Sequence, residues 1–178
     1  MKLKIELKGI NQYKRMIGEN QMRTLYVRTV NKVATLCARG ARSELSAEFN
    51  LKPGELNVRV ERANRFNLTP SLVASSRKKT VASFRPVQTP AGVSAEIRRG
   101  HQTAFPGAFI QDVRGKKQVL KRRSTKRYPV DVLRTDVSIG KLLFSDRVRD
   151  RIRRIIRENA QAIFDEVIRT YATRKVKK

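Results

Sequence analysis

Residues 21–49, QMRTLYVRTVNKVATLCARGARSELSAEF, set the fold class of this chain. Apolar or small side chains recur in them every three or four positions, which is the period of a helix with one buried face. The Lys-Pro-Gly sequence at residues 52–54 then breaks the pattern. The spacing therefore predicts a long amphipathic helix over about 21–49, with its buried stripe at Met22, Leu25, Thr29, Val33, Leu36, Cys37, Ala41, Leu45 and Phe49.

A second long helix is predicted near the other end of the chain, over about 145–173. Ser145 is a suitable N-cap, and Asp146 follows it at the positive end of the helix dipole. Apolar residues again return at helical spacing. They are Val148, Ile152, Ile155, Ile156, Ile163, Val167 and Tyr171.

The region between the helices has the pattern of strands. After Pro70, short runs rich in β-branched and aromatic residues alternate with turn sequences, and they predict strands at 71–76, 80–84, 92–98, 104–113 and 117–122. Residues 2–8 alternate apolar and charged side chains, as a half-exposed strand does. Residues 55–64 fit either a strand or a short helix, and the short helix is favoured. The chain is thus predicted to be a single α+β domain over 1–178, in which a mostly antiparallel sheet from about 70–123 packs against two long amphipathic helices.

Charge is the strongest functional signal. The chain has 41 Lys and Arg against 15 Asp and Glu, a formal net charge of +26. The excess is spread evenly, because each of four successive stretches carries a net +6 or +7. Such a folded body repels itself unless a polyanion or an acidic partner offsets the charge. We therefore expect a structured cationic surface rather than a basic tail.

Several classes of function are disfavoured. Cys37 is the single cysteine, so no disulfide can form within the chain, which suits a reducing cytoplasm. No run approaches the roughly 20 apolar residues of a membrane span, and residues 2–8 lack the apolar core of a signal peptide. One His and one Cys cannot make a zinc site, and Glu96, Asp112 and Asp131 are not placed together by any motif. We expect no enzyme, no metal and no cofactor.

Residues 92–143 resemble a known family. The phage minor tail protein Z family has a strand that leads through a glycine to a second strand, and the chain has a similar sequence in GVSAEI (92–97), Gly100 and PGAFI (106–110). The family's next elements follow in the same order, as VLKRR (119–123), YPVDVL (128–133) and VSIGKLL (137–143). The chain departs from that pattern in two places. Ala95 stands where the family usually has Val, and Asp136-Val137 stands where it usually has a Gly-Pro-like pair.

The resemblance implies a structural virion protein at the head-proximal end of a tailed-phage tail, made in the host cytoplasm. Such a protein completes the tail, helps to join it to the head and seats the DNA end at the neck. Its implied partners are other neck and tail proteins, viral DNA and further copies of itself in a ring, expected to hold six. The alternative is a basic nucleic-acid-binding module of the ribosomal or nucleoid kind, without a virion role.

Two cationic runs are the candidate contact residues. The first lies on a predicted hairpin and holds Arg114, Lys116, Lys117, Lys121, Arg122, Arg123, Lys126 and Arg127. The second is a helical stripe of Arg147, Arg151 and Arg154. The hairpin run favours sequence-independent contacts to phosphates, with docking onto an acidic neighbour and a solvated loop as the alternatives. The arginine stripe suits forked contacts to phosphate or carboxylate, and equally the ordinary polar face of an amphipathic helix.

Sequence-specific base reading is not expected. The chain has no Trp, and aromatic residues make up only 6% of it. The phenylalanines stand mostly where a core is predicted, at Phe66, Phe84, Phe105, Phe109 and Phe164.

Overall fold

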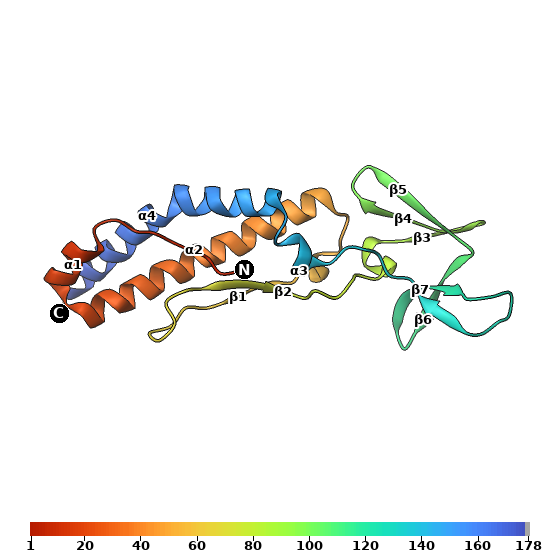
Figure 1. Cartoon of the computed structure of the whole chain (residues 1–178), viewed down its shortest axis with the longest axis horizontal. Helices are drawn as coiled ribbons and strands as arrows, with labels where there is room; N and C mark the ends of the chain where they lie inside the picture. Colours follow the sequence, from red (N-terminus) through yellow and green to blue (C-terminus); the bar gives the residue numbers. More distant parts are fainter. Residues whose placement is uncertain (177–178) are drawn as a thin grey trace. The chain divides into compact units, whose positions relative to one another are not determined.

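The computed structural model describes residues 1–176 and has the predicted α+β class (Figure 1). The chain divides into two compact units. The first holds residues 1–42, 58–74 and 143–176, and the second holds residues 43–57 and 75–142. The expectation of a single domain stays a prediction. Within the described residues the strands form three small antiparallel sheets, where one sheet was predicted.

Two long helices form the body of the first unit. They are α2 (Glu19–Glu48), of which residues up to 42 belong to this unit, and α4 (Asp146–Val176). The short helix α1 (Ile10–Ile17), which the sequence reading did not predict, precedes α2. α2 and α4 run antiparallel and touch closely at Gly40, where an added Cβ would lie 2.2 Å from Cδ1 of Ile155 (Figure 1). The predicted stripe of α2 is buried throughout, except for half-buried Leu36.

A two-stranded sheet completes the first unit and corrects the prediction for residues 55–64. Glu55 ends a 3-10 turn (Pro53–Glu55), and residues 58–61 form strand β1 (Val58–Glu61), which pairs with β2 (Ser71–Ala74). The strand is favoured over the short helix because it buries Val58 completely, together with Leu72, which lies opposite Val60 on β2. The Asn31 side chain of α2 then fixes the chain beyond β1, by accepting the Ala63 N–H at 2.8 Å and donating to its carbonyl at 3.0 Å.

Residues 2–8 make no strand, which corrects another prediction. The alternation was right, since Leu3 and Ile5 are buried while their neighbours are exposed. Only Lys2 forms a β-bridge, to Ser71. A period of two reports which side chains are buried, and it does not supply a neighbouring strand to pair with.

The second unit carries the other two sheets. One has the order β3 (Val87–Thr89), β4 (Gly92–Arg98), β5 (His101–Pro106), and the other has the order β6 (Ala108–Val113), β7 (Lys116–Arg122), β8 (Val130–Val132). The predicted strand at 104–113 is split between β5 and β6 by Gly107, whose φ is +69°. The predicted strand at 80–84 is instead a 3-10 turn (Val81–Phe84) that buries Phe84 completely.

Two features of the family-like stretch have structural causes. Gly92 has a φ of +151°, and an added Cβ would lie 2.3 Å from the Phe105 carbonyl oxygen, so only glycine fits there. A short helix, α3 (Ile139–Leu142), follows Ser138. The Ser138 hydroxyl donates to the Ser76 carbonyl at 2.9 Å.

The phenylalanines divide into core and surface. Phe84 and Phe164 are fully buried, and Phe105 and Phe109 are half-buried. Phe66 is 83% exposed, which corrects its assignment to the core. It lies in the β1–β2 connection, where the Asn64 side chain accepts the Phe66 and Asn67 N–H groups at 2.8 Å each.

Candidate functional site

The first basic run begins on a tight hairpin between β6 and β7. Val113 pairs with Lys116, so the loop is the two residues Arg114 and Gly115, with φ values of +54° and +73°. Two consecutive positive φ values make the hairpin turn whose twist matches that of the flanking strands. The hairpin prediction is confirmed. The turn places Arg114, Lys116 and exposed Lys117 together at one end of the sheet.

The other cations of the run gather at the opposite end of β7. Lys121 and Arg122 are both exposed, and successive strand residues point to opposite faces. The Arg122 guanidinium lies 5.6 Å from the centre of the Phe109 ring. Lys116 and Lys121 are five strand residues apart, about 17 Å at the usual rise. The run is therefore two clusters, one at each end of β7, and not one patch.

Arg123 differs from its neighbours because it has an acidic partner. Its Nε and Nη2 donate to Oδ2 and Oδ1 of Asp131 at 2.6 and 2.8 Å. The hydrogen bond from Arg123 lowers the pKa of Asp131, and the same bond raises the pKa of Arg123. Both groups are exposed, so Asp131 competes with any phosphate that approaches Arg123.

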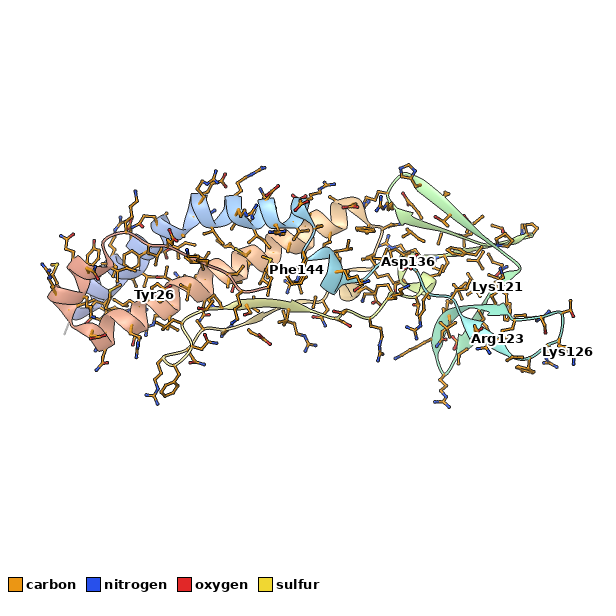
Figure 2. The ribbon with its side chains drawn as sticks, viewed as in Figure 1. Tyr26, Lys121, Arg123, Lys126, Asp136 and Phe144 are labelled. Atoms are coloured by element: carbon orange, nitrogen blue, oxygen red, sulfur yellow. The ribbon has the colours of Figure 1, made fainter. Side chains whose placement is uncertain are left out.

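The connection from β7 to β8 carries the remaining predicted cations. Lys126 and Arg127 are exposed there, and the Arg127 guanidinium lies 5.7 Å from the ring centre of Tyr128, which is itself 67% exposed. Figure 2 shows Lys126 on this loop beyond Lys121 and Arg123. The loop thus extends the second cluster with further positive charge.

A groove of about 560 Å³ borders the first cluster and adds two cations that the sequence reading missed. Lys52 and Arg134 line it together with Lys116 and Lys117. The Lys52 N–H donates to the Ser83 carbonyl at 3.1 Å, and Arg134 forms a β-bridge with Thr80. The carboxylate in the lining, Glu55, is held by Lys79 at 2.6 Å. The groove therefore keeps a positive excess that suits an anionic group.

The helical stripe lies on α4, in the first unit. Arg147 and Arg154 are exposed, whereas Arg151 is half-buried with its Cγ 3.7 Å from where a Cβ on Gly40 would lie. Its aliphatic stem thus packs against α2. Arg149 and Arg153, beside the stripe, are paired with Asp146 and Asp150 at 3.6 and 3.1 Å. This face of α4 is less strongly cationic than its sequence indicated.

In residues 1–176, no group of three His, Cys, Asp or Glu side chains could hold a metal ion. Burial raises the pKa of Cys37 to about 12, so that thiol is protonated and unreactive at neutral pH. None of the described helices is both long and apolar enough to cross a membrane.

Comparison with known protein families identifies a family that this chain matches. A family model described as prophage minor tail protein Z (GPZ) matches residues 7–174. No curated protein and no solved structure matches the chain. The family match includes residues of both units, and it covers both the basic run at 114–127 and the arginine stripe at 147–154.

Proposed function

We propose that this chain completes the head-proximal end of a phage tail. The proposal starts from the family, because the chain belongs to the prophage minor tail protein Z family and is thus a structural component of a phage tail. In this role it joins the tail to the head and seats the end of the viral DNA at the neck. The match over residues 7–174 is the observation that carries the proposal. It also favours a virion role over a ribosomal or nucleoid-like module.

The proposal includes a closed ring of six copies around the DNA path. A tail has cyclic symmetry, and head-to-tail contacts between identical subunits close into a ring when the rotation fits. A net charge of +26 opposes self-assembly in free solution, so the ring forms on its tail partners.

The contact with DNA is assigned to the β6–β8 sheet. The groove beside Lys116 and Lys117 supports this at one end of β7, and exposed Lys121 and Arg122 support it at the other. Cations on a structured surface bind phosphates without reading bases. Docking of this surface onto an acidic tail protein is the competing assignment.

The salt dependence of DNA binding separates these two assignments. The combined change Lys121→Ala, Arg122→Ala and Arg123→Ala is expected to weaken binding to all duplex sequences alike and to flatten the plot of log affinity against log salt. Each lost phosphate contact flattens that slope by roughly 0.9. Because Asp131 already holds Arg123, and Lys121 and Arg122 point to opposite faces of the sheet, the expected total is one or two contacts, roughly 0.9 to 1.8, and not three.

The matched control removes three exposed arginines elsewhere, by Arg15→Ala, Arg77→Ala and Arg169→Ala. It changes net charge equally and should leave the slope close to that of the unaltered chain. An unchanged slope in the Lys121, Arg122 and Arg123 variant would assign the sheet to protein docking instead.

A further inference from the structure

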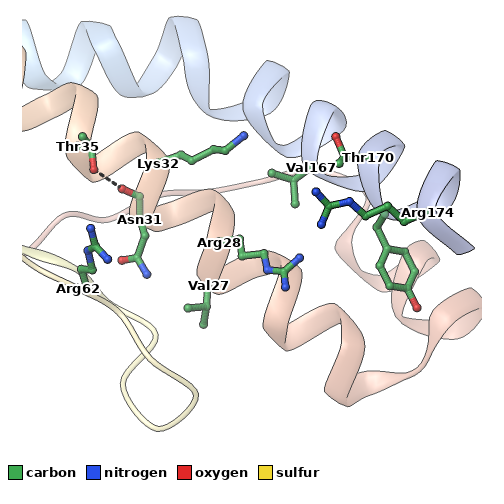
Figure 3. Close-up of a pocket in the computed structure, with 10 residues that line it drawn as sticks. Val27, Arg28, Asn31, Lys32, Thr35, Arg62, Val167, Thr170 and Arg174 are labelled. Carbon is green, nitrogen blue, oxygen red and sulfur yellow. Dashed lines mark hydrogen bonds between the residues drawn. The ribbon is translucent and has the colours of Figure 1, made fainter.

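A second cationic hollow lies in the first unit, away from every residue assigned above. It has a volume of about 480 Å³ and opens between α2 and α4 (Figure 3). Arg28 and Lys32 come from α2, Arg174 comes from α4, and Arg62 follows β1. Figure 3 shows Arg28 and Arg174 extending from the two helices into the space between them. We call this hollow the interhelical pocket.

The charge of the interhelical pocket is not neutralised from within. No acidic residue lines it. Lys32 is paired at 3.1 Å with Glu166, which lies outside the lining. Among the described residues 1–176, Arg28, Arg62 and Arg174 have no ion pair or side-chain hydrogen bond. Three guanidinium groups around one hollow repel one another, and an anion placed between them relieves that repulsion.

The uncharged polar groups of the pocket are already committed to the fold. Asn31 uses its amide on both backbone groups of Ala63. The Thr35 and Thr170 hydroxyls donate to the carbonyls one turn earlier, at 2.9 and 2.8 Å. The backbone that carries the arginines is therefore fixed before any ligand arrives, and the ordering cost of binding falls on the three arginine side chains.

Apolar surface forms the rest of the lining, through Val27, buried Val167 and half-buried Tyr171. A guanidinium cluster over apolar groups fits a carboxylate side chain with an apolar neighbour, which is how an acidic protein segment presents itself. A duplex offers phosphates on a convex, hydrophilic backbone and no apolar side chain for the valines.

The chain itself is a poor source of that segment. Its 15 acidic residues are scattered, and Asp165-Glu166 is the one adjacent pair in the sequence. Glu166 is already bound to Lys32. A second copy of the chain therefore does not supply the occupant.

We propose that the interhelical pocket binds an acidic segment of a neighbouring tail protein, with its carboxylates on Arg28, Arg62 and Arg174 and an interleaved apolar side chain on Val27 and Val167. This inference rests on the proposed function, which supplies a tail protein as the neighbour. It names the chemistry of that neighbour, and it does not involve the β6–β8 sheet.

The test uses the full chain and a short fluorescent peptide of alternating glutamate and leucine. Fluorescence anisotropy is expected to show roughly tenfold or more weaker binding after Arg28→Gln, Arg62→Gln and Arg174→Gln together, since charge-assisted hydrogen bonds are lost. The control, Arg15→Gln, Arg77→Gln and Arg169→Gln, has the same net charge and should bind within about twofold of the unaltered chain. The single change Arg174→Glu, at an exposed residue, should also weaken peptide binding. It replaces the triple variant in the test if the triple variant loses its helical circular dichroism signal.

Three outcomes would overturn the proposal. Equal peptide binding by the triple variant and the control would mean that only overall charge attracts the peptide. Equal binding of oligoglutamate and the glutamate–leucine peptide would remove the role of the valines. Loss of duplex DNA binding with unchanged peptide binding would make the pocket a phosphate site. None of these depends on where the chain lies in the virion, so a failure of the proposed function is separately visible.

Discussion

Phage particles assembled without this chain are expected to show filled heads and tails of normal length that do not join into infectious virions. A completion component acts after its neighbours have been built, so its loss leaves both precursors intact. Infectivity should fall by orders of magnitude while the numbers of heads and tails hold. The even spread of cationic charge over a folded body is the physical motive, because a ring of such surfaces holds one duplex end through many weak phosphate contacts.

Counting heads, tails and joined particles by electron microscopy, beside a plaque assay, checks this expectation. Empty heads or shortened tails would show that the chain acts earlier, and would rule out completion. The variant with Lys121, Arg122 and Arg123 changed to Ala is the informative companion. If it enters particles normally and they are fully infectious, the DNA role is wrong even where the location is right.

Phe164→Ala is expected to reproduce the loss of the whole chain. Phe164 is fully buried on α4, and its ring meets that of Tyr13 edge-on at a centroid distance of 5.8 Å. Truncating a buried Phe to Ala costs about 3–5 kcal/mol, from lost burial and the cavity left behind. Domains are commonly stable by about 5–15 kcal/mol, so a large part of the free energy of unfolding would disappear. Urea denaturation followed by circular dichroism measures the change.

Phe66→Ala is the matched control for that variant. It removes the same atoms from a side chain that is 83% exposed, so the free energy of unfolding should stay within about 0.5 kcal/mol of that of the unaltered chain. If Phe164→Ala unfolds at the same urea concentration as Phe66→Ala, the core described for the first unit is wrong.

The helices were predictable because their evidence is local. Val33, Cys37 and Ala41 repeat at helical spacing, and each is buried in the structure. The sheets were less predictable because a strand needs a partner. Residues 2–8 alternate correctly and find only one bridge, while Val81–Phe84 closes into a turn because Phe84 fills the core. Period alone does not decide either case.

The sequence predicted which basic residues belong to the candidate site, but only part of their arrangement in space. The sequence identified the basic run and predicted a hairpin through residues 114–116, of which the structure leaves Arg114 and Gly115 as the loop. It did not reveal that β7 separates the run into two clusters. Lys52 and Arg134 are far apart in the chain and meet only through tertiary packing, as do Arg28 and Arg174 in the interhelical pocket. No local pattern could have joined either pair.

Electron microscopy of virions that carry a labelled copy of this chain tests the central claim most directly. The account predicts label at the head-proximal end of the tail, arranged as a closed ring of six around the DNA path. Label distributed along the tail shaft, a single copy beside the axis, or virions without label would contradict it.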